Sequence, residues 1–132
     1  MIWPARTCVI ALTLALGLGA GGCGPSGPPR FQVSGTVTFG GQPVPAGVIY
    51  FDPDVTKGHD GPQGYAQIKD GHYDTRQEGK PVTPGPHVVR IQGFDGKSAN
   101  ELPLGQPLFP QAQQNRDMPA ADSTQDFSIP AP

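Results

Sequence analysis

The sequence is poor in cysteine and in basic side chains. It has two cysteines, and nine lysine and arginine residues against eleven acidic residues in 132 positions. Cys8 falls in the leader described below, so one thiol would remain in the mature chain, which excludes an intramolecular disulfide. The acidic balance, without a basic patch, argues against nucleic acid as a partner.

The sequence also lacks an apolar run long enough for an ordinary membrane span. Its apolar segment covers residues 8–18, whereas a spanning helix needs about 20 residues. Arg6 precedes this segment, and small residues at 19–22 follow it. A charged start, a short apolar run and a small-residue exit are typical of a secretory signal. We therefore predict a signal peptide at 1–22.

Cys23 follows this segment directly and resembles the cysteine of a bacterial lipoprotein signal, which is lipidated and becomes the new N-terminus. Gly21 and Gly22 fit that motif, whereas Ala20 stands where leucine is commonest. We predict lipidation at Cys23 and anchoring to a membrane of the cell envelope. Gly24, in place of aspartate, favours the outer membrane or periplasm side. The alternatives are cleavage after Ala20, which leaves a soluble secreted protein, and an uncleaved anchor, which the short run disfavours.

Glycine and proline are abundant, with 19 and 17 residues. They gather between short patterned segments, which is typical of strands joined by turns. Residues 23–30 form a Gly/Pro-rich spacer, whose prolines favour an extended arm. The remaining segment, 31–130, has the size of one domain.

Apolar and polar residues alternate with period two, which predicts strands at 31–39, 48–51, 65–69, 72–75, 87–92 and 125–129. Gly35 falls on the buried face of the first strand, so another backbone or a large side chain should approach it closely. Segment 95–124 has four prolines and no helical period. It predicts a short strand near 104–109 and otherwise an ordered excursion. The fold class is all-β, a small antiparallel β-sandwich of about seven strands with no major helix after the signal peptide.

The pair Asp70-Gly71 lies between two of these strands and predicts a tight hairpin. A type I′ turn needs positive φ at both central residues, which aspartate and glycine tolerate. In that register Lys69 faces His72. Ile68 then faces the next residue along, Tyr73, and the two side chains share the buried face.

Four segments resemble the carboxypeptidase-regulatory-like, or transthyretin-like, domains of small planctomycete-type lipoproteins. They are Val33–Val44, Ala46–Pro53, Asp70–Tyr73 and Pro84–Ile91, with His87 in the usual tyrosine place. The resemblance implies a transthyretin-like or Ig-like sandwich. It implies no particular activity, because the shared residues are turn and core residues. A branch of this fold group that hydrolyses 5-hydroxyisourate ends in Tyr-Arg-Gly-Ser, which the end of this chain does not match.

The three histidines are candidate metal ligands. They are spaced 13 and 15 residues apart, without the close pairs that metal motifs bring together. We predict that His59 and His72 face solvent and that His87 is packed, with its ring bonded to backbone. No metal or other cofactor is expected.

Three loop carboxylates raise the question of calcium, which takes six to eight oxygen ligands. They are Asp52, Asp54 and Asp60, and the D-x-D-x-D-G loop is absent. Asp52 and Asp54 flank Pro53, which also fits a strand-ending turn. Calcium binding therefore stays open at this stage.

Nothing in the sequence points to catalysis. Ser34 and Ser128 fall in predicted strands without a G-x-S-x-G elbow, and Ser26 and Ser98 fall in loops. No helix follows Gly40-Gly41 to cradle a phosphate. The expectation is that the protein is not an enzyme.

The leading hypothesis is an exported, lipid-anchored, non-catalytic module that binds protein or glycan through loops on a rigid scaffold. An exposed aromatic cluster would favour it, and the candidates are Tyr65, Phe94 and Phe109. The alternative is a structural or accessory envelope lipoprotein that assembles through sheet edges. A soluble secreted domain is the third hypothesis.

Overall fold

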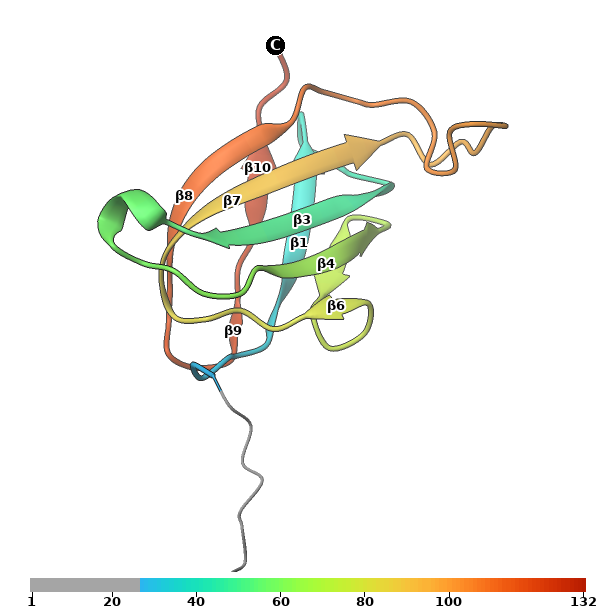
Figure 1. The fold of residues 1–132 in the computed structure, drawn as a ribbon. Helices are drawn as coiled ribbons and strands as arrows, with labels where there is room; N and C mark the ends of the chain where they lie inside the picture. The colour runs from blue at the N-terminus through green and yellow to red at the C-terminus, as the bar shows by residue number, and fades with distance from the viewer. Residues whose placement is uncertain (1–26) are drawn as a thin grey trace, which may run out of the picture.

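The computed structural model describes residues 27–132, and almost all of it is β-structure. The predicted signal peptide, Cys23 and the first residues of the spacer lie outside the described residues. Seven strands form one curled sheet in the order β10-β1-β5-β4-β3-β7-β8 (Figure 1). In chain order these are β1 Val33–Phe39, β3 Ala46–Pro53, β4 Gly64–Lys69, β5 His72–Asp74, β7 Gly85–Phe94, β8 Ala112–Met118 and β10 Phe127–Ile129. Three two-residue strands lie beside them, β2 Gln42–Pro43, β6 Gly79–Lys80 and β9 Ser123–Thr124, and a 3₁₀ turn, η1, covers Val55–Lys57.

The curled sheet folds over its own core, which confirms the predicted all-β sandwich. In Figure 1, β1 and β10 cross behind β3 and β7. Phe51 of β3 meets Phe127 of β10 and Tyr73 of β5, with ring centroids 6.3 and 6.0 Å apart. Neighbouring strands are antiparallel except that β9 and β10 run parallel to β1.

Local sequence patterns account for most of these strands. Asp70 and Gly71 have φ of 50° and 78°, Lys69 pairs with His72, and Ile68 and Tyr73 are both buried. The predicted hairpin is therefore confirmed.

Gly35 is approached as closely as its place on the buried face predicted. A Cβ at this position would lie 2.0 Å from the carbonyl oxygen of Gln125. Real atoms cannot come so close, so only glycine leaves room for the β9–β10 connection to pass.

The prediction of a short strand near 104–109 is wrong. In this stretch one isolated bridge joins Phe94 to Pro107, and the strand lies later, at β8. The residues of β8, Ala-Gln-Gln-Asn-Arg-Asp-Met, show no apolar alternation, because backbone pairing with β7 supports the strand while its side chains are mostly polar. Its half-buried positions include Gln114 and Arg116.

The two ends of the described chain lie at opposite ends of the sandwich (Figure 1). The chain arrives through residues 27–30 at the end where β9 lies. The C-terminus leaves from the other end, and the β7–β8 connection projects beyond the tip of β7. That connection is ordered by Asp95, whose carboxylate accepts hydrogen bonds from the backbone of Lys97 and Gln106. Within residues 27–132 no helix is long and apolar enough to cross a membrane.

Candidate functional site

A polar groove of about 620 Å³ opens on the outer face of the sheet over β1, β5 and β4. Its side chains occupy the strand positions that alternate with the buried ones, which places them on the side away from the core. The lining includes Ser34, Thr36, Gln67, Lys69, Glu78 and Asp126. We call this cavity the groove.

The groove forms because the strands around β1 are short or interrupted. Between β9 and β10 the chain turns in over Gly35, and the hydroxyl of Tyr73 donates to the carbonyl of Gln125. Asp126 then points outward, and its carboxylate accepts the backbone N–H of Thr36 at 2.9 Å. The Asp126 side chain thus accepts the hydrogen bond that a neighbouring strand carbonyl would otherwise accept, and its carboxylate forms part of the groove wall.

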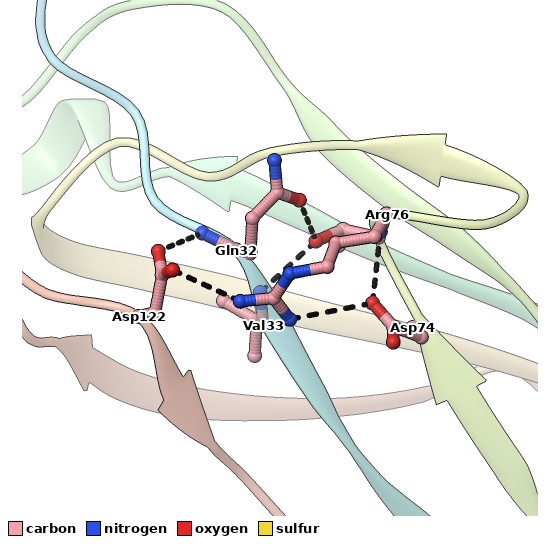
Figure 2. A network of polar contacts seen from close by, with 6 residues as sticks. Gln32, Val33, Asp74, Arg76 and Asp122 are labelled. Atoms are coloured by element: carbon pink, nitrogen blue, oxygen red, sulfur yellow. Dashed lines mark hydrogen bonds and ion pairs between the residues drawn. The ribbon is translucent and has the colours of Figure 1, made fainter.

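A second polar network lies where the chain enters the sandwich, and it shares Asp74 with the groove (Figure 2). The carboxylate of Asp122 accepts from the backbone of Gln32 at 2.8 Å and from Arg76 Nη2 at 2.9 Å. Asp74, which lines the groove, accepts the backbone N–H of Arg76 at 2.8 Å, and the hydroxyl of Thr75 donates to Gln32 Oε1. We call this network the N-terminal clasp. It joins β1, β5 and the β8–β9 turn.

Acceptors outnumber cations in the groove. Its carboxylates are Asp74, Glu78 and Asp126, and its lysine is Lys69, whose ammonium lies 3.8 Å from Glu78. Both partners of this ion pair are largely exposed, so it contributes little to stability and is free to rearrange around a ligand. Burial raises the pKa of Tyr73, and the charge of Asp126 adds to the effect, so the phenol stays protonated at neutral pH.

An aromatic row continues the same face beside the groove. Tyr65 of β4, Tyr50 of β3 and Arg90 of β7 are direct cross-strand partners, and the Arg90 guanidinium lies 4.8 Å from the centre of the Tyr50 ring. Arg90 is also held by the carboxylate of Asp52. We call Tyr65, Tyr50 and Arg90 the tyrosine row. It lies two residues along β4 from Gln67 of the groove.

The predicted aromatic candidates do not form one cluster. Phe109 packs against Phe39, with ring centroids 5.0 Å apart, and Phe94 lies at the end of β7. Tyr65 has the partner that the sequence analysis missed, Tyr50. The sequence does indicate that Tyr50 faces outward, because it alternates with the buried residues Ile49 and Phe51.

Candidate hydroxyl, imidazole and carboxylate groups do meet in the groove. Ser34 pairs with Asp74 across β1 and β5, and Thr36 pairs with His72. The His72 ring, however, is hydrogen-bonded to the backbone oxygen of Asp70. Among the described residues no hydrogen bond joins that ring to either hydroxyl or to Asp74. Ser128 lies exposed on β10, and Ser98 lies in the β7–β8 connection.

The histidines are only partly where the sequence placed them. His72 is exposed, and His87 is buried with its Nδ1 2.8 Å from the carbonyl oxygen of Gly85, so both of these predictions are confirmed. The solvent-facing prediction for His59 is wrong. Its ring packs edge-on against His87, with centroids 5.3 Å apart, because the loop after η1 folds back onto β7.

The loop carboxylates have separate protein partners. Asp52 accepts hydrogen bonds from Arg90 and Gln63, Asp54 caps η1 through the backbone of Thr56, and Asp60 is exposed. In the part of the chain that the structure describes, no group of three or more histidine, cysteine or acidic side chains is placed to hold a metal ion.

The two edges of the sheet face each other. Gln114 of β8 donates to the backbone oxygen of Ser128 in β10, and Arg116 donates to Gln125 and lies 4.4 Å from the centre of the Phe127 ring. These side chains bridge the gap between β8 and β10. Edges covered in this way are poor templates for an added strand, which weighs against assembly through sheet edges.

A scan against protein-family models and a search of curated proteins both find no match for this chain.

Proposed function

We propose that this chain is an exported, lipid-anchored, non-catalytic β-sandwich module that binds glycan at the cell envelope, with the groove and the tyrosine row as its binding face. The observation that carries the proposal is the groove. It gathers hydroxyl, amide and carboxylate groups on a rigid sheet and continues into two cross-strand tyrosines.

The chemistry of this face suits a sugar chain better than a flat protein partner. Sugar hydroxyls both donate and accept, and they match carboxylates, amides and hydroxyls such as Asp126, Gln67 and Ser34. The apolar faces of sugar rings pack on aromatic side chains, which Tyr50 and Tyr65 supply. Rigid strands hold these groups in place, so little conformational entropy is lost on binding.

The position of the groove is compatible with an anchor at Cys23. The chain enters the sandwich at one end, next to the N-terminal clasp (Figures 1 and 2). The groove is lined by residues of β1, β4 and β5. A Gly/Pro-rich spacer before this point would hold the domain away from the membrane.

Glycan binding is tested with the full-length protein in detergent on an array of neutral, amino and acidic oligosaccharides, followed by calorimetry with the strongest binder. Gln67→Ala should weaken that binding about fivefold to tenfold, the effect of one lost hydrogen bond. Gln113→Ala on β8 removes an exposed glutamine outside the groove and should leave binding unchanged. In a second matched pair, Glu78→Gln changes a carboxylate of the groove and should weaken binding. Its control, Glu101→Gln, changes a carboxylate outside the groove and should leave binding unchanged.

Two outcomes would contradict this part of the proposal. One is the absence of binding to any sugar on the array. The other is equal weakening by the groove variants and by their controls, which would place the binding surface elsewhere.

The anchor is tested by the intact mass of the protein purified from the membranes of its own host. A diacylglyceryl-type mass increase on a chain that begins at Cys23, lost together with membrane association in Cys23→Ala, is expected. A soluble, unmodified chain that begins at Gly21 would overturn the anchor and leave the glycan-binding proposal to its own test.

A further inference from the structure

His59 and His87 pack against each other outside the groove, and they have no part in the proposed glycan site. His87 of β7 is 1% exposed, and His59, from the loop that follows η1, covers it edge-on. The Nε2 atom of His59 is itself buried and has no hydrogen-bond partner within the described chain. A charge on His87 would be buried against this second ring, and burying a charge without a compensating partner is costly.

The hydrogen bonds of His87 fix its neutral form. A carbonyl oxygen can only accept, so the Nδ1 of His87 carries the proton that is donated to Gly85. Nε2 is then the acceptor for the hydroxyl of Thr83, at 3.3 Å. A second proton would have to enter at this covered nitrogen, which requires that the cover move away.

The cover is a short segment whose own hydrogen bonds run mainly to Asp54, which accepts from the backbone of Thr56, Lys57 and His59. Residues 55–62 include the exposed Val55 and Lys57, and Gly58, which has φ of 70°. The backbone of Asp54 ties the start of the segment to Pro86. Further along the segment, the His59 ring lies against β7. A Cβ on Gly85 would lie 3.1 Å from this ring, so the imidazole rests on the glycine backbone. We call residues 55–62 the flap.

We propose that the flap is a pH-sensitive latch, closed over the neutral His87 and released when His87 takes up a proton. Release uncovers His87 and Thr83 next to a small polar cavity of about 140 Å³ between the flap and β8. The inference does not depend on the proposed glycan site.

The charges around His87 set the direction of the effect. Burial lowers its pKa, and the neighbouring His59 lowers it further, while the bond to Gly85 and the more distant charges of Asp52 and Asp117 act the other way. Lys57 of the flap and Arg116 of β8 line the cavity beside it. Because the closed form disfavours the proton, its stability is complete above the ordinary histidine pKa of about 6.5 and falls as the pH drops below that value.

The test is hydrogen–deuterium exchange of the full-length protein between pH 7.5 and pH 5, corrected for the intrinsic exchange rate. Linkage to one proton predicts that the open population of peptides covering 55–62 rises by up to about tenfold per pH unit below about pH 6.5. His87→Gln should abolish this dependence. His72→Gln, a change to an exposed histidine, should retain it.

The wild-type protein provides a test that needs no variant. The NMR titration of the His87 ring must have its midpoint below about pH 6.5, and the open population of the flap must rise as the pH falls from about 6.5 toward that midpoint. Protection of 55–62 that stays constant while His87 titrates would overturn the latch, as would a pH dependence that persists in a folded His87→Gln protein.

Discussion

The two crossing layers of the sandwich are held in different ways. In β3 and β7, eight consecutive register pairs join two long strands, and Ile49, Phe51, Val89 and Ile91 are fully buried between the layers. Around β1, the neighbouring strands β5, β9 and β10 have two or three residues each, and side chains replace part of the ladder. Both layers bury apolar side chains that stabilise the fold, and the first does so on long, regularly paired strands. The second layer has less regular strand pairing, and the groove lies in it.

The largest effect is expected from the layer of long strands. Phe51→Ala removes a ring that contacts both Tyr73 and Phe127 and should lower the free energy of unfolding by about 3–5 kcal/mol, because a cavity remains in the core. Urea denaturation measures the change. Val55→Ala, at a 72% exposed position, should stay within about 0.5 kcal/mol. Similar losses in both variants would contradict the assignment of Phe51 to the core.

A smaller effect is expected where the layer around β1 is most crowded. Gly35→Ala places a Cβ against the carbonyl of Gln125 and should cost about 1–3 kcal/mol, because the β9–β10 connection must move. The same movement should displace Asp126 and weaken the binding of any ligand in the groove. Ser34→Ala, one residue away on the outer face, serves as the control for stability. An unchanged unfolding midpoint in Gly35→Ala would show that the connection does not pass there.

The bridge between the sheet edges should contribute about 1 kcal/mol. Arg116→Gln loses the cation–π contact with Phe127 and the bond to Gln125. Amide exchange in β10 should accelerate while that of β3 is unaffected, which mass spectrometry resolves by peptide. Lys57→Gln changes an exposed cation and is the matched control. Uniform acceleration across all strands would mean that Arg116 supports the whole fold and not the edge.

The smallest effect concerns the ion pair at the end of the tyrosine row. Partial burial alone would raise the pKa of Asp52, but hydrogen bonds from Arg90 and Gln63 and the charge of Arg90 outweigh it, so the pKa lies below its ordinary value. The pair therefore stabilises the fold above about pH 3.9 and loses that contribution as the pH falls through the lowered pKa. Asp52→Asn should remove up to about 1 kcal/mol at pH 7 and less at pH 2, where more of the carboxylate is protonated. An equal loss at both values would exclude the charge as the cause.

The same contrast explains how much of the structure the sequence predicts. Strands such as β3 and β7 bury one face, so their alternation is visible in the order of residues, and the Asp70-Gly71 turn carries its own conformational signal. β8 carries no such signal. Gln114 and Arg116 occupy its inward positions, and they make sense only beside Ser128 and Phe127, which come from a strand that follows them in the chain.

The candidate site was less predictable than the fold. Ser34, Gln67 and Asp126 come from three distant segments, and only the order of strands in the sheet brings them together. Tyr50 and Tyr65 are each visible as outward residues, but their pairing depends on the register of β3 with β4. His59 was misplaced because a loop residue surrounded by polar neighbours gives no sign that it folds back onto a strand.

The direction of β1 has a mechanical consequence. The chain enters at the start of this strand, and β1 has β5 on one side and β9 and β10 on the other. A pull on the N-terminal end, opposed by a load held elsewhere on the sheet, acts along the strand and shears all of its hydrogen bonds at once instead of opening them one by one. The N-terminal clasp lies where such a force arrives and would take the first part of the tension, while the shear of the β1 hydrogen bonds would set the unfolding rate of a domain under load.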